Sequence, residues 1–300
     1  MTGSGNDDNR AHLDEEVVVP MTGGAAALGP SLERVRYEVV PMKGVEAQIE
    51  HLPVDAVVTV TVSPTKGLRA TLDLTRLLTE RGHATVPHLA ARLLTDAAEL
   101  GAVIDELRDV GVTEVFVVAG DAKEPAGAFE GAAELLEAMA SLGHHLEGIG
   151  ITGYPETHAF IPDQTTIDAM ARKAPHATYI VSQICYDPTV IIRWIAAVRA
   201  RGTTLPIHIG IPGVVDFARL LRISKRVGIG DSMRFLRKQW ATITRLVSGY
   251  QPDGLIDALT PTLADPAMRV AGWHLFTFNE IRRTEAWRQD LLARYARSET

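Results

Sequence analysis

Cysteine is almost absent from this chain of 300 residues, in which Cys185 is the only one. A lone cysteine excludes a disulfide within the chain and a zinc site built from cysteine ligands. Because Cys185 stands in an apolar run over residues 178–186, we expect a buried structural thiol. Such sparse cysteine use fits a reducing compartment, and we expect the protein to be cytoplasmic.

Long apolar runs and an excess of positive charge are also missing. No run reaches the roughly 18 apolar residues of a membrane-spanning helix, so we expect no membrane partner. With 37 acidic and 30 basic residues and a formal charge of −7, the chain lacks the basic surface that nucleic-acid binding requires. One basic stretch, over 219–238, predicts either the solvated faces of helices or a region that attracts an anionic cofactor or substrate tail.

The first thirty residues lack a core pattern. They begin polar and acidic, without the basic and apolar segments of a secretory signal, and continue into a stretch rich in glycine and alanine over 22–30. We therefore expect a disordered tail over 1–30 and a single domain over 31–300.

Short apolar runs alternate with longer helical periods from residue 35 onward. The runs are strongly apolar, as expected of strands buried on both faces of a sheet. The eight predicted strands lie at 35–41, 56–63, 84–90, 114–120, 148–154, 178–186, 206–211 and 270–278.

Eight strands, each followed by a helix, predict an α/β fold of the (β/α)8 TIM-barrel type. The alternative is an open, doubly wound sheet, which the absence of a Gly-x-Gly-x-x-Gly turn and of a P-loop lysine motif disfavours. Thr95-Asp96 predicts a helix start, and Gly111 and Gly143 predict helix ends.

Polar side chains gather where the predicted strands end, which is the rim that carries catalysis in barrel enzymes. Several have ordinary explanations, since Asp121 can turn the chain, Asp187 before a proline can cap a helix, and His208 can be a core histidine. The candidates are Glu38, Thr61, His88, Asp121, Tyr154, Glu156, His158, Gln183, Asp187, His208, Thr277 and Asn279.

Glu38 is the hardest of these residues to explain by structure alone. A carboxyl group inside an apolar strand costs free energy unless it is paired or functional. Glu38 and Asp121 at one rim suit acid–base chemistry in which one carboxyl is protonated and the other is charged. No local metal-ligand spacing is present, so we expect no metal, although a site of dispersed ligands stays open. No Gly-x-Ser-x-Gly elbow indicates a serine nucleophile.

In order and spacing, these rim residues resemble the catalytic barrel of methylenetetrahydrofolate reductases, from about Val35 onward. The most specific match is YPETH at 154–158. The others are YEVVP with Glu38, VTVT with Thr61, PHL with His88, the pair Gly120-Asp121, the pair Arg172-Lys173, Gln183 with Asp187, and FTFN at 276–279.

The resemblance implies reduction of 5,10-methylenetetrahydrofolate to 5-methyltetrahydrofolate with NADH or NADPH, in one-carbon metabolism and methionine supply. Glu38 would be the general acid that opens the substrate ring, a role that requires a protonated carboxyl and that an apolar strand favours. Asp121 would contact the pterin and stabilise the developing cation, and Gln183 would orient the pterin. Arg219 stands where the family has a substrate-binding glutamine.

The resemblance also implies FAD as a cofactor. The matching positions are Thr61, His88, Gly120, Asp121, Tyr154, His158, Arg172 and Lys173.

Several positions depart from the family pattern. Ala119, Thr166, Ala169 and Glu280 replace an arginine, an aspartate, an asparagine and a second arginine. Some of the missing groups would contact the flavin, so two schemes stay open: transfer through FAD, or direct hydride transfer from the nicotinamide. Two other functions also stay open, namely oxidation of methyltetrahydrofolate in a demethylation pathway and folate binding without catalysis.

Overall fold

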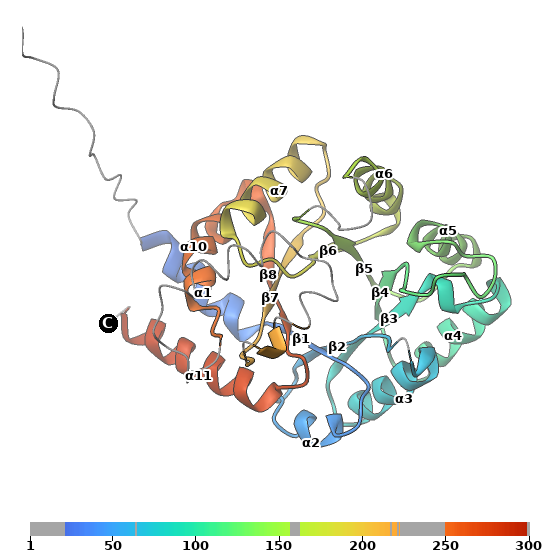
Figure 1. Ribbon diagram of the computed structural model, residues 1–300, viewed down its shortest axis with the longest axis horizontal. Coiled ribbons are helices and arrows are strands. Elements are labelled where there is room, and N and C mark those ends of the chain that lie inside the picture. Colours follow the sequence, from blue (N-terminus) through green and yellow to red (C-terminus); the bar gives the residue numbers. More distant parts are fainter. Residues whose placement is uncertain are drawn as a thin grey trace, which may run out of the picture.

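Eight parallel strands close into one barrel in the order β1 to β8 (Figure 1). The computed structural model describes residues 22–63, 65–156, 163–216, 218–220, 222 and 250–298. The closed barrel confirms the predicted (β/α)8 fold and excludes the open sheet. The strands are β1 (Arg36–Val39), β2 (Val57–Val60), β3 (Ala84–Ala90), β4 (Glu114–Val118), β5 (Gly148–Gly153), β6 (Tyr179–Ser182), β7 (Ile207–Pro212) and β8 (Val270–Phe276).

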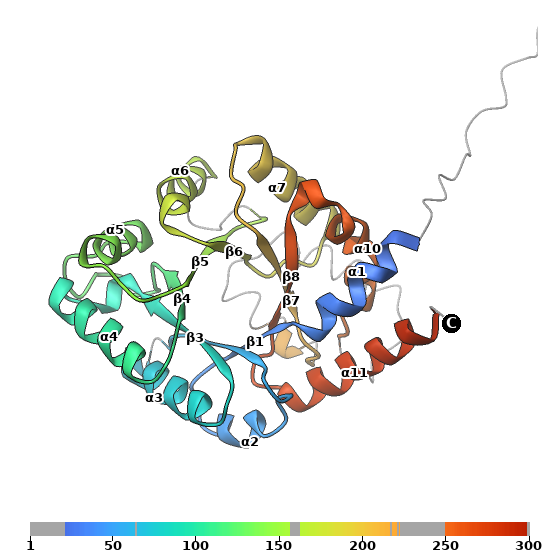
Figure 2. The same cartoon turned by 180° about the vertical axis from the view of Figure 1, so that it is seen from behind.

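Helices alternate with the strands and form the outer ring of the barrel (Figures 1 and 2). The ring helices are α2 (Val45–Ile49), α3 (Gly67–Glu80), α4 (Ala97–Asp109), α5 (Ala132–Leu142), α6 (Asp163–Lys173), α7 (Pro188–Ala200), α10 (Asp253–Ala264) and α11 (Ile281–Ser298). Short 3₁₀ turns η1 (Ala91–Leu93), η2 (Ala174–His176) and η3 (Pro266–Met268) join some of them to strands.

Local sequence signals set the ends of these helices. Asp96 caps α4 by accepting a hydrogen bond from the Glu99 amide, and Asp187 caps α7 by accepting from the Thr189 and Val190 amides. Gly111 and Gly143 follow α4 and α5 with φ of 82° and 73°, a conformation that favours glycine. The predicted helix start at Asp96, the cap at Asp187 and both predicted ends are confirmed.

An N-terminal helix, α1 (Thr22–Glu33), corrects the expectation of a disordered tail over residues 22–30. Leu28 and Leu32 lie four residues apart, hence on one face, and both are fully buried. The Trp273 indole donates to Ser31 Oγ at 2.8 Å, and the Arg288 guanidinium donates to the Leu32 carbonyl at 2.9 Å. These contacts dock α1 beside α10 and α11 (Figure 2), whereas residues 1–21 lie outside the described chain.

The barrel interior is more polar than the aliphatic filling usual for this fold. Arg36 donates to Glu114 and, at 3.2 Å, to the Tyr179 hydroxyl, and its guanidinium lies 4.5 Å from the centre of the Tyr179 ring. Gly150 provides the space, because a Cβ atom there would lie 2.4 Å from Tyr179 Cζ. The barrel interior near the amino ends of the strands therefore holds an ion pair that packs against the Tyr179 ring.

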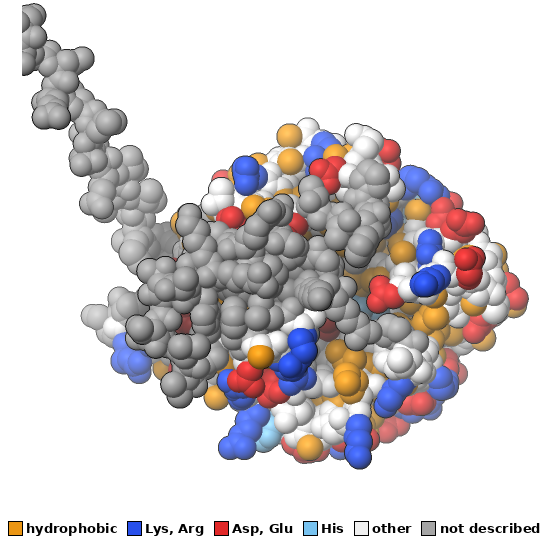
Figure 3. Space-filling model, in the orientation of Figure 1, with side chains coloured by type: hydrophobic (Ala, Val, Ile, Leu, Met, Phe, Trp, Pro, Cys, Tyr) orange, Lys and Arg blue, Asp and Glu red, His pale blue; other side chains and the backbone are white. Residues whose placement is uncertain are grey.

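The outside of the molecule carries charges of both signs. Basic and acidic side chains are interspersed along the outer edge of the molecule in Figure 3. Cys185 is buried, as expected. Within the described ranges, no helix is long and apolar enough to cross a membrane, and no group of His, Cys, Asp and Glu side chains is arranged to hold a metal ion.

Candidate functional site

The Glu38 carboxyl group lies inside the barrel between two imidazoles. Its Oε2 atom is 3.2 Å from Nε2 of His274 on β8 and 3.8 Å from Nε2 of His88 on β3. Only 16% of the Glu38 side chain is exposed, and both histidines are almost fully buried. The two groups within 4 Å of the Glu38 carboxyl that form charged or polar contacts with it, among the residues described, are therefore both imidazoles.

Burial keeps the neighbouring His88 imidazole neutral. Desolvation lowers the pKa of His88 to about 4, although the Glu38 charge opposes this shift. His88 also packs against Phe116, with ring centres 4.7 Å apart and the ring planes tilted by 42°. A neutral ring at this place puts no fixed positive charge beside the Glu38 carboxyl.

The turn after β8 fastens the backbone of β1. The Thr277 hydroxyl donates to the Glu38 carbonyl, and the Asn279 amide donates to the Val40 carbonyl at 2.9 Å and accepts from the Val40 amide at 2.8 Å. Phe278 and Asn279 both adopt left-handed backbone conformations, with φ of 51° and 60°. Two consecutive non-glycine residues in this region store strain, which is typical of functional sites.

Asp121 and Gln183 lie on the loops that follow β4 and β6. Asp121 is exposed directly after Gly120, whose φ is 91° and whose added Cβ would lie 3.1 Å from Ala90 Cβ. Gln183 is half-buried, and its Oε1 accepts a hydrogen bond from the Ile184 amide at 2.8 Å. The structure thus places both residues after the carboxyl ends of strands, the end at which β1 carries Glu38.

Arg219 and Glu280, two positions that depart from the family pattern, form an ion pair with each other. The Arg219 guanidinium also donates to the Phe278 carbonyl at 2.6 Å. The arginine predicted to bind substrate therefore also holds the strained turn after β8.

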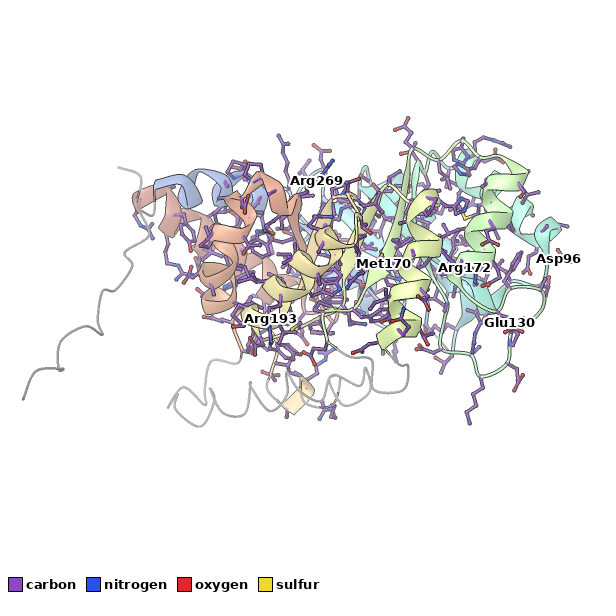
Figure 4. All side chains as sticks on the ribbon, turned by 90° about the horizontal axis from the view of Figure 1, so that it is seen from above. Asp96, Glu130, Met170, Arg172, Arg193 and Arg269 are labelled. Atoms are coloured by element: carbon purple, nitrogen blue, oxygen red, sulfur yellow. The ribbon has the colours of Figure 1, made fainter. Side chains whose placement is uncertain are left out.

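Two of the residues expected to hold FAD, Thr61 and Tyr154, follow different strands, β2 and β5. Thr61 is half-buried beyond β2, and its amide donates to the Val39 carbonyl at 2.9 Å. Tyr154 lines a cavity of about 300 Å³ between α6 and α7, together with Met170 and Trp194. Figure 4 shows Met170 and Arg193 on these neighbouring helices. His158 lies outside the described residues.

Arg172 and Lys173, the two cationic side chains expected to contact the flavin, bind other groups of the protein. Arg172 pairs with Glu134 and Glu137 of α5, both at 2.9 Å, on the outside of α6 (Figure 4). Lys173 is 95% buried and donates to the Thr152 carbonyl at 3.2 Å and hydroxyl at 3.1 Å, and desolvation lowers its pKa to about 8. With Ala119 in place of an arginine as well, the described residues do not fit the phosphates of FAD.

His274 is the functional candidate that sequence reasoning missed. It lies two residues before Phe276 in the last predicted strand, so alternation places both side chains on the same face. A histidine at an alternating position of an apolar barrel strand was the available signal. Its partner could not be read from the sequence, because β1 and β8 meet only when the barrel closes.

Fold and site together define a (β/α)8 barrel with acid–base groups in its interior. The family model described as methylenetetrahydrofolate reductase matches residues 46–283, and the chain belongs to that family. The matched segment begins after β1, so Glu38 rests on its own geometry and on the sequence motif.

Two proteins illustrate the relationship. The chain is 28% identical over 152 residues to methylenetetrahydrofolate reductase 2 of Saccharomyces cerevisiae, which covers 47% of this chain and 24% of the yeast protein. The match thus spans about a quarter of that relative. Among solved structures, an uncharacterized protein from Clostridium thermocellum, described as binding two copies of 5-methyl-5,6,7,8-tetrahydrofolic acid, has a similar fold. Its TM-score is 0.56 at 15% identity, covering 87% of this chain and 97% of that one.

Proposed function

We propose that the protein reduces 5,10-methylenetetrahydrofolate to 5-methyltetrahydrofolate with NADH or NADPH. The observation that carries the proposal is the Glu38 carboxyl, held inside the barrel between two imidazoles in a chain of this family. The Clostridium thermocellum barrel, described as a binder of methyltetrahydrofolate, supports a folate as the ligand of this fold.

Glu38 acts as the general acid in this proposal. In its protonated form it gives a proton to N10 of the substrate, the bond between N10 and the bridging methylene carbon breaks, and a 5-iminium cation results. The carboxylate that remains takes up a proton from solvent before the next turnover.

Asp121 and Gln183 bind the folate in this proposal. The exposed Asp121 carboxylate stabilises the iminium cation by its charge, and Gln183 orients the pterin through its amide. NADH or NADPH supplies the hydride that adds to the iminium carbon. Because the described residues do not fit FAD, we propose that the hydride passes directly from the nicotinamide to the folate.

Purified protein tests the function and the cofactor together. We expect oxidation of NADH or NADPH that depends on 5,10-methylenetetrahydrofolate, without visible flavin absorbance and without stimulation by added FAD. Glu38→Gln should reduce the rate roughly 100-fold or more while leaving folate binding intact, because the amide keeps the size of the side chain but cannot donate the carboxyl proton. Glu130→Gln, at an exposed glutamate in the loop after β4 (Figure 4), is the matched control and should keep the wild-type rate.

Three results would contradict the proposal. Folate binding without turnover in either direction would show a non-catalytic protein, and turnover only of methyltetrahydrofolate would show the oxidative reaction. A Glu38→Gln rate near that of wild type would remove Glu38 from the mechanism. Bound flavin that is required for activity would overturn only the direct transfer.

A further inference from the structure

Among the described residues, His274 is the one side chain within hydrogen-bond distance of the Glu38 carboxyl group, so it is the first candidate for a group that acts on it. Its Nε2 atom lies 3.2 Å from Glu38 Oε2, and only 1% of the His274 side chain is exposed. The ring stands edge-on to Phe276 at 4.9 Å between centres, which restricts its rotation. In the sheet register, Arg36 pairs with His274 and Glu38 pairs with Phe276, so the imidazole lies one layer below the carboxyl, away from the rim.

We infer that His274 is a positioning residue for Glu38: its Nε2–H donates to Oε2, fixes the carboxyl group and stabilises the carboxylate that remains after proton transfer. This inference rests on the proposed function for its catalytic consequence. The hydrogen bond itself does not depend on which substrate the barrel binds.

The surroundings of the ring favour the Nε2–H form. Among the described residues, no hydrogen-bond partner faces the buried Nδ1 atom of His274. A proton on Nδ1 would bury an unsatisfied donor, whereas a proton on Nε2 points at a carboxyl oxygen. Donation to the carboxylate fixes its orientation and stabilises the charge that remains once the proton has moved to the substrate nitrogen.

Other titratable groups face this pair from the barrel wall. His88 on β3 is buried and His208 on β7 is half-buried, and desolvation lowers the pKa of both rings. Arg36 on β1 lies below, but Glu114 and Tyr179 bind its guanidinium. Asp121 lies above, on the exposed loop after β4. Of these groups, none besides His274 lies within hydrogen-bond distance of the Glu38 carboxyl in the described chain.

Three substitutions separate a donor from mere packing. His274→Gln places an amide N–H near the position of Nε2, His274→Asn keeps polarity without that reach, and His274→Leu removes the donor. The rate of a general acid falls at high pH as the acid loses its proton. We expect this fall to move up by about one pH unit in the Leu and Asn variants, with kcat on the plateau below the fall about tenfold lower and the KM for folate little changed. The Gln variant should stay close to wild type in both respects.

His208→Gln is the matched control, since it changes another imidazole of the barrel wall, which is half-buried and packs edge-on against Tyr179 rather than against Glu38. It should leave the pH of the fall unchanged. A fall that stays in place in both the Leu and Asn variants, or equal losses in all three His274 variants, would overturn the inference while wild-type turnover upholds the proposed function.

Nitrogen NMR of the imidazoles gives a readout without turnover, and it serves even if a His274 variant fails to fold. We expect the Nε2–H form of His274 in the wild type at neutral pH, and a shift of its Nε2 resonance in Glu38→Gln that Glu130→Gln does not cause. A proton on Nδ1, or a resonance that ignores Glu38→Gln, would overturn the inference. Absence of wild-type turnover with these NMR results intact would instead count against the proposed function.

Discussion

Arg219 and Glu280 show how two unusual residues can compensate for each other. The family pattern has a glutamine and an arginine at these positions, whereas this chain has an arginine and a glutamate that form an ion pair. Their side chains are 37% and 27% exposed, so the pair adds little to stability by itself. Its value lies in the second contact, in which Arg219 holds the Phe278 carbonyl of the strained turn.

Restoring the family residues tests this coupling. Arg219→Gln leaves Glu280 without its counterion and frees the turn, and Glu280→Arg places two guanidinium groups together. We expect each single substitution to lower kcat/KM about tenfold, and the double variant to recover most of that loss, because residues in contact are not additive. Steady-state kinetics of the four proteins form the double-mutant cycle. Additive losses in the double variant would show that the two residues act independently.

The identity of the residues predicted part of the site, but not the directions in which their side chains point. Glu38 could be recognised because a carboxyl inside an apolar strand needs a reason. Arg172 and Lys173 are neighbours in sequence, yet a helix turns about 100° per residue, so one faces the glutamates of α5 and the other is buried against Thr152. Their separation depends on how α6 packs, which the motif alone does not contain.

At the scale of elements, the strands were predictable and the first helix was not. Each predicted strand overlaps an observed one, since continuous apolar runs bounded by turn residues are a strong local signal. α1 has a composition rich in glycine and alanine that resembles a linker. Its stability comes from Trp273 and Arg288, both more than two hundred residues away in sequence, and such contacts leave no local pattern.

The turn between β8 and α11 carries a prediction about strain and activity. Asn279→Ala loses two hydrogen bonds to Val40 and places alanine in a left-handed conformation, so we expect a loss of about 2–3 kcal/mol in unfolding free energy. Asn279→Gly loses the same hydrogen bonds without the steric cost and should be more stable than the alanine variant by about 1 kcal/mol. Urea unfolding measures both.

The same two variants report on the link to Glu38. Because the turn holds β1 at Thr277 and Asn279, both substitutions should lower kcat to a similar degree. Equal stability of the two variants would show that the left-handed backbone costs nothing here. Wild-type kcat in both would show that the turn does not position Glu38.

At the scale of the whole molecule, the polar barrel interior makes stability depend on pH. The fold class could be predicted from the alternation of strands and helices, but the interior could not, because the inward residues of eight strands meet only in the closed barrel. Glu38, His88, His208 and His274 come from four different strands. That these four side chains lie inside one barrel is a property of the tertiary structure.

Burial of neutral histidines predicts loss of stability in mild acid. Desolvation lowers the pKa of His88 from 6.5 to about 4 and that of His208 well below 6.5, so the unfolded chain binds more protons than the folded protein between these values. The unfolding free energy should therefore be highest above about pH 6.5 and should fall as the pH drops towards 4. The loss from His88 alone should be up to about 3 kcal/mol. Urea unfolding across this range measures the slope.

His208→Gln should flatten this slope, since glutamine binds no proton, whereas His144→Gln, at an exposed histidine, should not. An unfolding free energy that stays constant from pH 6.5 to 4 would mean that these imidazoles titrate alike in the folded and unfolded chain.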